Sequence, residues 1–299
     1  MIRVGIVGTE NSHALAFARF FNTTNAQGVH PFDNIRVTAI AGDPESNKRI
    51  SNSVEIAFAS QNPQELLGKV DAVMITSRRG SVHYEQVIPF LKSGLPVFID
   101  KPFTSGIKEA SLLLDAIRTT GGMVMGGSGC KYAPEVAELK NQVRALRQKK
   151  KILSASMGFT VMDSPYDGFW FYAPHLVEMV LEIFGYDPLG VAAVKHEHGV
   201  LAELRYQDIS VTLHFTKRLP DASCTVYTAE GTIHKKIDIT GIYAAEATRF
   251  GDMLLSGRLP QTIEQLATHV WVIGAILKSV ECNGLFSAIE LGGERIREE

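Results

Sequence analysis

Asp100 and Lys101 are the residues best placed for chemistry, because they follow an apolar run that starts at Leu95 and they precede Pro102. A short run of this kind, opened by a glycine, is typical of a strand buried on both faces of a sheet. Ligands of open parallel sheets bind beyond the carboxyl ends of the strands, so both side chains are expected at that edge. A lysine ammonium held there would stabilise negative charge that develops on a ligand. The alternative is a solvated lysine in a surface turn.

His175 is the second candidate, since it follows Pro174 and precedes an apolar helical pattern over 176–181. Because proline is favoured at the first helical position, we predict that this imidazole lies in the first turn of a helix. The partial positive charge of a helix N-terminus would lower the histidine pKa and favour a neutral base that can accept a proton. The alternative is a capping or core histidine. Tyr172 is a secondary candidate for proton relay or a substrate hydrogen bond, its alternative being an aromatic wall.

The chain up to about residue 125 alternates strand patterns with helical patterns, as a doubly wound parallel sheet requires. Strands are predicted at 2–7, 35–41, 72–75, 95–99 and 123–125, and helices at 14–21, 84–91 and 107–117. Small, polar or acidic residues follow the first three strands, namely Gly8, Thr9, Asp43, Thr76 and Ser77. We expect them at the same sheet edge as Lys101, because parallel strands end on one side.

The pattern changes beyond residue 150. Strand candidates at 152–159, 190–195, 200–206, 210–216, 224–228 and 232–239 follow one another with turns between them, which indicates a mostly antiparallel sheet. Two helices are predicted at 243–255 and 263–281, and Thr262 and Gln265 have the spacing of a capping box for the second. We therefore predict an α/β fold of two domains, 1–125 with the parallel sheet and 126–299 with an open α+β sheet, the closing helices being free to pack back on the first domain.

Composition favours small molecules as partners. With 299 residues, 45% hydrophobic content and a net charge of −2, the chain can bury two cores but offers no strong field for nucleic acid or membrane surfaces. The apolar run at 270–277 is too short to span a bilayer, and no leader is expected before the strand that starts at residue 2. Three distant cysteines argue against disulfides and a zinc site, so no metal and a cytoplasmic location are expected.

Several groups of residues together resemble the Gfo/Idh/MocA family, the relatives of glucose-fructose oxidoreductase and inositol dehydrogenase. They are Val7-Gly8-Thr9, Asp43, Thr76-Ser77 with His83, Asp100-Lys101-Pro102 in place of the family's Glu-Lys-Pro, and His175-Leu176-Val177-Glu178 in place of its His-x-x-Asp. The resemblance covers nearly the whole chain. It implies a Rossmann domain that binds a nicotinamide cofactor, followed by an open-sheet substrate domain.

The resemblance also implies a set of cofactor-binding residues. These are Gly8, Thr9, Asn11, Ser12, Asp43, Thr76, Ser77, His83, Asp100 and Lys101. Free N–H groups at the first helix start suit a phosphate, although Asn11 and Ser12 are equally good helix caps. Asp43 would bind ribose hydroxyls and repel the 2′-phosphate of NADP, which favours NAD, while Lys48 and Arg49 keep NADP as the alternative.

The implied reaction is hydride transfer between nicotinamide and a carbinol carbon of a sugar, polyol or related hydroxy compound. His175 would remove the hydroxyl proton, Lys101 would bind the developing alkoxide, and Tyr172 would assist. Lys131 stands where the family commonly has an arginine or another polar contact with the substrate, its alternative being a solvated lysine. A homo-oligomer, either a dimer or a tetramer, is expected because a helix-free sheet face usually marks an association surface.

The first turn departs from the family pattern, since Glu10 and His13 replace the second and third glycines of Gly-x-Gly-x-x-Gly. A Glu10 charge about 4 Å from a phosphate would weaken cofactor binding roughly tenfold to a thousandfold unless the side chain faces solvent. His13 would either contact the phosphate or fill the gap between helix and strand.

The second departure is Phe171, which replaces an aspartate four residues before His175. A phenyl ring cannot relay a proton, so Asp167, Tyr172 or Glu178 would have to orient the imidazole. These departures leave one alternative open, a catalytically idle relative that binds a nucleotide or sugar as a sensor or scaffold.

Overall fold

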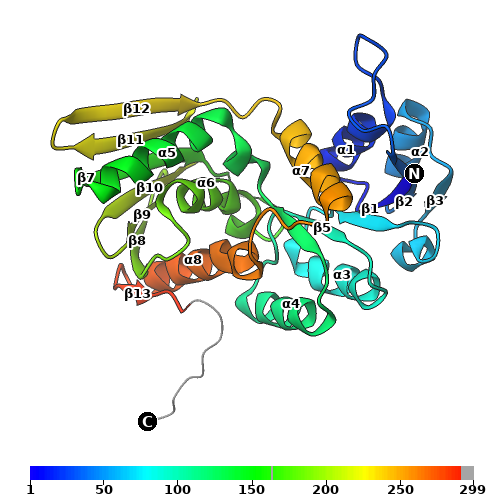
Figure 1. Ribbon diagram of the computed structural model, residues 1–299. Helices are drawn as coiled ribbons and strands as arrows, with labels where there is room; N and C mark the ends of the chain where they lie inside the picture. The colour runs from blue at the N-terminus through cyan, green and yellow to red at the C-terminus, as the bar shows by residue number, and fades with distance from the viewer. Residues whose placement is uncertain (163, 291–299) are drawn as a thin grey trace. The chain divides into compact units, whose positions relative to one another are not determined.

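A computed structural model describes residues 1–162 and 164–290 of the chain (Figure 1). The chain forms two compact units. The first unit comprises Met1–Gly127 and Gly241–Leu266, and the second comprises Ser128–Thr240 and the segment that begins at Ala267. Among the described residues, no helix has both the length and the apolar character needed to cross a membrane.

The first unit is built on a six-stranded sheet with the spatial order β3-β2-β1-β4-β5-β6, and every pair of neighbours is parallel. The strands are β1 (Ile2–Val7), β2 (Ile35–Ala41), β3 (Phe58–Ser60), β4 (Ala72–Ile75), β5 (Val97–Asp100) and β6 (Val124–Gly127). The strand order reverses between β1 and β4, which is the switch point where dinucleotide-binding sheets hold their ligand. The predicted doubly wound parallel sheet is confirmed.

Helices of the first unit pack on this sheet, and three of them share a phenylalanine-rich core with it. They are α1 (Ser12–Asn22), α2 (Pro44–Ser53), α3 (His83–Lys92), α4 (Ile107–Thr120) and α7 (Ile242–Ser256), with short 3-10 turns at η1 (Pro63–Leu66) and η2 (Gly80–Val82). The ring centroid of Phe98 lies 5.4 Å from that of Phe17 on α1 and 5.8 Å from that of Phe250 on α7. The late helix α7 therefore completes a core that the first 127 residues begin.

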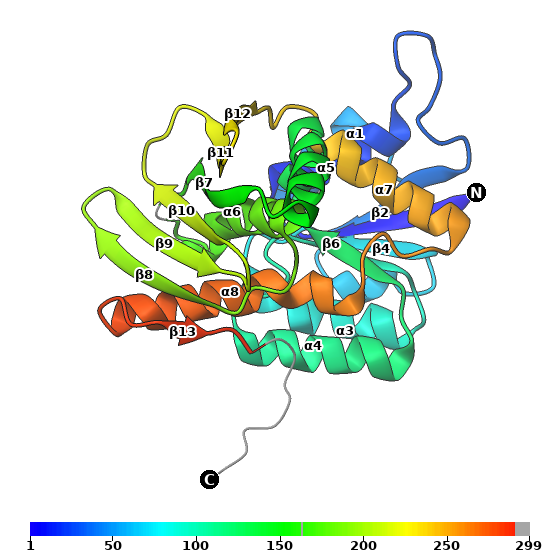
Figure 2. The same cartoon turned by 60° about the vertical axis from the view of Figure 1, so that its left-hand side comes forward.

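The second unit is a seven-stranded sheet with the order β12-β11-β7-β10-β9-β8-β13, antiparallel except for the β7–β10 pair. Its strands are β7 (Ile152–Thr160), β8 (Gly190–His196), β9 (Gly199–Arg205), β10 (Ser210–Thr216), β11 (Ala222–Thr228), β12 (Gly231–Ile237) and β13 (Ser287–Ala288). One face is covered by α5 (Pro134–Gln148), α6 (Phe169–Phe184) and the later part of α8 (Ile263–Glu281), and the short turn η3 (Gly129–Tyr132) precedes α5 (Figure 2). The mostly antiparallel α+β sheet was predicted.

Several boundaries agree closely with the sequence patterns. The bounds of β2, β10 and α8 coincide with the predicted 35–41, 210–216 and 263–281. The capping box also forms, because Thr262 N–H donates to Gln265 Oε1 at 2.9 Å and Gln265 N–H donates to Thr262 Oγ1 at 3.3 Å. The sequence reasoning did not identify α2 or α5.

The predicted start of the helix around His175 is wrong. Helix α6 begins at Phe169, after Gly168 with a φ of 59°, so Pro174 lies inside the helix and His175 lies in its second turn. The ring of Phe169 packs 5.0 Å from that of Phe215 on β10, and this tertiary contact outweighs the local preference of proline for a helix start. The argument that a helix N-terminus keeps this histidine neutral therefore fails.

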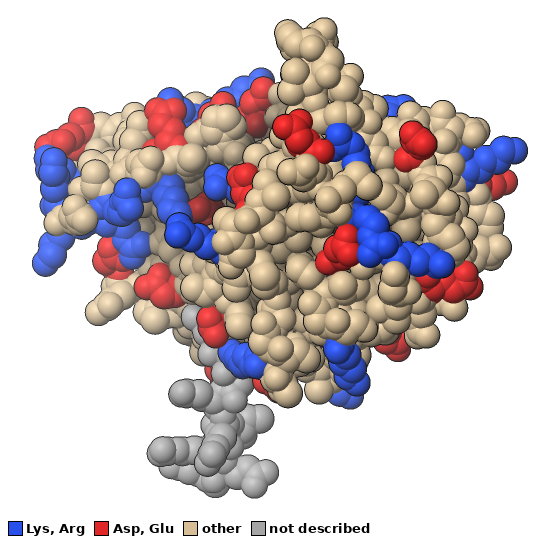
Figure 3. Space-filling view, turned by 45° about the vertical axis from the view of Figure 1, so that its right-hand side comes forward, with Lys and Arg blue, Asp and Glu red and all other residues tan. Residues whose placement is uncertain are grey.

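Charged side chains of both signs are interspersed over the face shown in Figure 3. This distribution matches the near balance of 30 basic and 32 acidic residues in the sequence.

Candidate active site

Gly8 brings the turn after β1 against the turn after β4. Its φ is 90°, and a Cβ added there would lie 2.2 Å from the backbone nitrogen of Ser77. Thr76 Oγ1 fixes the same approach by donating to the carbonyls of Val7 and Gly8, both at 3.0 Å. Only glycine fits this position, so the first turn keeps the one family glycine on which its geometry depends.

Thr9 connects the first turn to the turn after β2. Its side chain is fully buried, and Oγ1 donates to Asn47 Oδ1 at 2.8 Å. Asp43, at the end of that turn, caps α2 by accepting the Ser46 N–H at 2.8 Å. This hydrogen bond lowers the pKa of Asp43, so its carboxylate is ionised at neutral pH.

Asn11 is the N-cap of α1, and Ser12 is the exposed first residue of that helix. Asn11 Oδ1 accepts the N–H of His13 at 3.3 Å, while its Nδ2 donates to the carbonyl of Thr76 at 2.9 Å and to Asp100 Oδ2 at 3.5 Å. One buried amide therefore joins the turns after β1, β4 and β5. The capping alternative for Asn11 is confirmed.

His13 and Asp100 form a buried pair, with Nδ1 2.5 Å from Oδ2. Burial alone would raise the pKa of Asp100, but the charge and hydrogen bond of His13, helped by Lys101, hold it below its ordinary value. The His13 ring also lies 4.5 Å from the ring of Tyr243 on α7. His13 thus anchors Asp100, a role that neither sequence-based alternative included.

Lys101 is only 3% exposed, so the solvated-lysine alternative is wrong. Its backbone N–H donates to Asp100 Oδ1 at 2.7 Å, and its peptide bond to Pro102 is cis. The buried carboxylate of Asp100 therefore holds the residue that the sequence predicts as catalytic, at the carboxyl end of β5.

His83 joins the turn after β4 to the turn after β5, which carries Lys101. Its fully buried ring has Nε2 2.8 Å from the Ser77 carbonyl and Nδ1 2.8 Å from the Pro102 carbonyl. Burial lowers its pKa, against the opposing effect of these carbonyls. The imidazole therefore stays neutral near pH 7 and fixes the turn after β5 relative to the turn after β4.

The carboxylate of Glu10 forms a hydrogen bond within the protein. Its Oε1 accepts the backbone N–H of Arg78 at 3.0 Å, at the turn after β4. A carboxylate therefore lies on the edge where a helix N-terminus and rim turns would otherwise offer N–H groups to an anion.

His175 has a hydrogen-bonding partner that the sequence reasoning missed. Its Nδ1 lies 2.7 Å from Ser128 Oγ and 3.4 Å from Cys130 Sγ, and Ser128 Oγ also accepts the N–H of Cys130. The ring of Phe159 on β7 packs against the imidazole with centroids 5.4 Å apart, and the ring of Tyr172 lies 6.4 Å away. The signal that could have revealed Ser128 is its position directly after β6.

Glu178 contacts both the backbone of Ser128 and the side chain of Lys131. Its Oε1 accepts the backbone N–H of Ser128 at 2.8 Å, and its Oε2 accepts from Lys131 Nζ at 2.8 Å. The side chains of Lys131 and Glu178 are 2% and 4% exposed, so a solvated Lys131 is excluded. Burial alone would lower the pKa of Lys131, but the charge of Glu178 outweighs it and raises that pKa.

The buried pair also contacts α8. His269 Nδ1 lies 3.7 Å from Glu178 Oε1, and burial lowers the pKa of His269, opposed by the nearby carboxylate. Of the three residues proposed to orient His175, Glu178 contacts the backbone of Ser128, whose hydroxyl contacts the imidazole. The ring of Phe171, where the family has aspartate, packs 4.7 Å from that of Tyr172 and 5.6 Å from that of Tyr166. Asp167 has a φ of 57°, and its carbonyl accepts the N–H of Trp170.

Four further histidines belong to the region of the second sheet. His196, His198, His214 and His234 lie on or next to strands of the second sheet, as the sequence predicts. Within residues 1–162 and 164–290, no three His, Cys, Asp or Glu side chains gather closely enough to hold a metal ion.

A strand order of 3-2-1-4-5-6 with polar turns at the carboxyl edge is the topology of the Rossmann class of dinucleotide-binding folds. Residues 2–128 match the model of the Gfo/Idh/MocA oxidoreductase family with its NAD-binding Rossmann fold. Residues 2–128 are therefore similar to the NAD-binding part of that family, and the predicted resemblance is confirmed.

The chain is 24% identical over 169 residues to the scyllo-inositol 2-dehydrogenase (NADP(+)) IolU of Bacillus subtilis, which covers 56% of this chain and 48% of that protein. The chain therefore spans about half the length of the curated relatives it matches.

Solved structures resemble the chain over nearly its whole length. A myo-inositol dehydrogenase from Corynebacterium glutamicum has a TM-score of 0.80 at 15% identity, covering 97% of this chain and 99% of that one. A scyllo-inositol dehydrogenase from Lactobacillus casei with bound NAD(H) and scyllo-inositol has a TM-score of 0.78 at 12% identity, with coverage of 97% and 99%. At these identities the likeness shows the fold of both units.

Proposed function

We propose that this protein is an NAD(P)-dependent oxidoreductase that transfers a hydride between nicotinamide and a carbinol carbon of a sugar, polyol or related hydroxy compound. The observation that carries the proposal is the buried Lys101 at the carboxyl end of β5, anchored through Asp100 and His13 in a unit that matches an NAD-binding family. A buried cation among the polar turns at this edge of the sheet would stabilise negative charge that develops on a substrate oxygen.

The turns at this edge fit a dinucleotide. Gly8 and Gly42 leave no room for a Cβ, so the backbone turns after β1, β2 and β4 are drawn together, and the ionised Asp43 stands at the end of β2. Asp43 would hold the ribose of NAD, with NADP as the alternative, and the start of α1 would face the diphosphate. Once bound, the nicotinamide supplies the hydride acceptor or donor.

The proton step belongs to His175. When Nδ1–H donates to Ser128 Oγ, Nε2 keeps its lone pair and can accept the proton of a substrate hydroxyl. The Lys101 ammonium would hydrogen-bond the same oxygen as its negative charge develops. The proposal requires both groups to act on one substrate, with Tyr172 and Lys131 as further contacts.

The substrate class follows from the relatives, which are named as inositol dehydrogenases. We assign cofactor binding to 1–125 and substrate binding to 126–299. We also propose a homo-oligomer, a dimer or tetramer, associated through the helix-free face of the second sheet. A cytoplasmic location is proposed because all three cysteines are free thiols.

Titration of the purified protein with NADH and NADPH, followed by nicotinamide fluorescence, tests the first half of the proposal. No binding at millimolar cofactor would reject it in favour of an idle relative. A panel of sugars and polyols then tests turnover, with Lys101→Ala expected to lower kcat by about a hundredfold or more. The exposed Lys108→Ala on α4 is the matched control and should leave kcat unchanged. Equal turnover in the wild type and Lys101→Ala would remove the lysine from the mechanism.

A further inference from the structure

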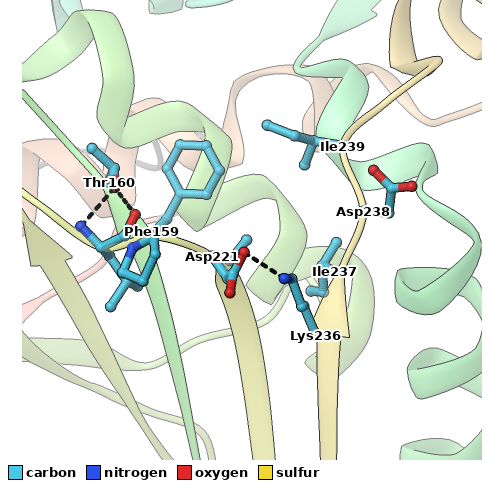
Figure 4. Close-up of a pocket in the computed structure, with 10 residues that line it drawn as sticks. Phe159, Thr160, Asp221, Lys236, Ile237, Asp238 and Ile239 are labelled. Carbon is cyan, nitrogen blue, oxygen red and sulfur yellow. Dashed lines mark hydrogen bonds and ion pairs between the residues drawn. The ribbon is translucent and has the colours of Figure 1, made fainter.

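A cavity of about 590 Å³ opens at the end of β7 and the start of the β11–β12 hairpin. Its walls come from the last residues of β7, the segment 219–222 and the chain from Lys236 to Ile239 (Figure 4). The volume lies within the range of about 300–1,000 Å³ that is typical of small-molecule sites. All of these residues belong to the second unit.

The cavity shares a wall with the candidate proton acceptor. Phe159 lines the cavity, and the same ring packs 5.4 Å from the ring of His175. A ligand in the cavity therefore lies against one side of the aromatic ring that contacts the imidazole. The relevance of this contact rests on the proposed function, in which His175 accepts the proton of the reacting hydroxyl.

The other walls combine apolar and charged side chains, and Asp238 lies beside Ile239 in Figure 4. In Figure 4, Ile239 points toward Phe159 across the cavity, and the ion pair of Asp221 and Lys236 lies beneath them with Oδ1 and Nζ 2.6 Å apart. Leu219 and Pro220 add further apolar surface. Ile239 is left partly exposed at the cavity, which is the position a hydrophobic face of a ligand would cover.

The polar groups define which ligand fits. Asp221 only accepts hydrogen bonds and Lys236 only donates them, whereas two adjacent hydroxyls can do both. The charges of Asp221 and Lys236 offset each other, and Asp238 adds a carboxylate to the lining, so the cavity favours a neutral ligand over a phosphorylated one. The pair is also exposed, 45% for Asp221 and 66% for Lys236, so it contributes little to folding and is available for binding.

We propose that this cavity binds a neutral polyhydroxylated ring, with its apolar face on Phe159 and Ile239 and a vicinal diol on Asp221 and Lys236. The ring is a second ring of the substrate, joined to the ring whose hydroxyl meets His175. The substrate class is therefore a glycoside or another two-ring polyol.

Kinetics with paired one-ring and two-ring probes tests this proposal. The pairs are D-glucose with maltose and with cellobiose, and myo-inositol with galactinol. For at least one pair, kcat/KM of the two-ring probe should exceed that of the one-ring probe by about tenfold. Asp221→Asn and Lys236→Met should each reduce that ratio to about one.

Glu230→Gln is the matched control, because Glu230 forms the same kind of ion pair with Lys151 at the opposite end of the same hairpin. It should leave the ratio unchanged. One-ring probes that react as well as every two-ring partner would overturn the cavity proposal and leave the oxidoreductase proposal intact.

Saturation-transfer NMR of the same probes, without cofactor, separates the two proposals. Two-ring probes that bind in the wild type, and bind more weakly in Asp221→Asn, support the cavity even if no probe is turned over, in which case the oxidoreductase proposal fails alone. Absence of binding by all two-ring probes overturns the cavity proposal.

Discussion

The carboxylate of Asp100 and the imidazole of His13 form a buried pair 2.5 Å apart, although 87 positions separate them in the chain. The family resemblance places a glycine at position 13. In this protein the third glycine is replaced by a group that compensates a buried charge. Each of His13 and Asp100 therefore stabilises the other. Replacing either residue is expected to perturb the turn that carries Lys101, because the Lys101 N–H donates to Asp100.

Replacing His13 with Gln is expected to shift acid unfolding to higher pH. The folded-state pKa of Asp100 lies below its unfolded value, so its stabilising effect is full above about pH 4 and is lost as pH falls through the folded-state pKa. Loss of the partner leaves a buried carboxylate uncompensated and costs about 3–5 kcal/mol. Urea unfolding between pH 3 and pH 8 measures both effects. An unchanged acid midpoint would show that His13 does not hold the Asp100 charge.

Replacing Glu10 with Gln is expected to tighten NADH binding. The Glu10 carboxylate lies at the turn after β4, and its charge opposes a diphosphate at this edge. Removing it should lower Kd about tenfold, and less at high salt because screening weakens the repulsion in the wild type. Nicotinamide fluorescence titration gives Kd. The exposed Glu85→Gln on α3 is the control for a general charge effect, and equal shifts in both variants would reject a local role for Glu10.

Replacing Ser128 with Ala is expected to lower kcat with little change in cofactor binding. The variant removes the hydroxyl 2.7 Å from His175 Nδ1, so the ring loses its fixed orientation and preferred tautomer. A loss of about tenfold or more is expected, together with a displaced limb in the pH profile of kcat. Ser128→Thr keeps the hydroxyl and should restore most of the rate. Identical pH profiles for Ala and wild type would show that Ser128 does not position the imidazole.

Replacing Lys131 with Met is expected to destabilise the second unit. Glu178 would remain buried without its cation, at a cost of about 3–5 kcal/mol measured by urea unfolding. The double variant Lys131→Met with Glu178→Leu should recover much of this loss, since an apolar pair of similar volume avoids the unpaired charge.

The same pair has a pH signature. Lys131 has a raised folded-state pKa, so its stabilisation is present below the unfolded value of about 10.4 and is lost as pH rises through the folded value. The alkaline loss should disappear in the double variant. Equal stability of the single variant and the wild type at pH 7 would contradict the assigned role of the ion pair.

Periodicity was sufficient to predict most of the fold. Apolar runs of four to seven residues with polar turns located β2 and β4, because strands buried in a parallel sheet carry this pattern in the sequence itself. The start of α6 was missed because the contact between Phe169 and Phe215 decides it, and that contact joins positions 46 apart.

Individual residues of the candidate site could be predicted from the sequence, but the contacts between them could not. Asp100 and Lys101 were identified from their places after a buried strand and His83 from the family resemblance, and all three are buried. Ser128 was missed, because its importance comes from a contact with His175 that spans 47 positions. The partner of His13 was missed for the same reason, since no local pattern encodes a pairing with Asp100.

Helix α7 belongs to the first unit but is encoded after most of the second unit. The backbone consequently passes between the units at 127–128, 240–241 and 266–267, and a single proteolytic cut leaves them covalently tied. Residues 1–127 alone would expose Phe98 where Phe250 now covers it, so this half is expected to aggregate when expressed by itself. Recombination that exchanges one unit for another would need several breakpoints. The two units are therefore expected to be inherited together.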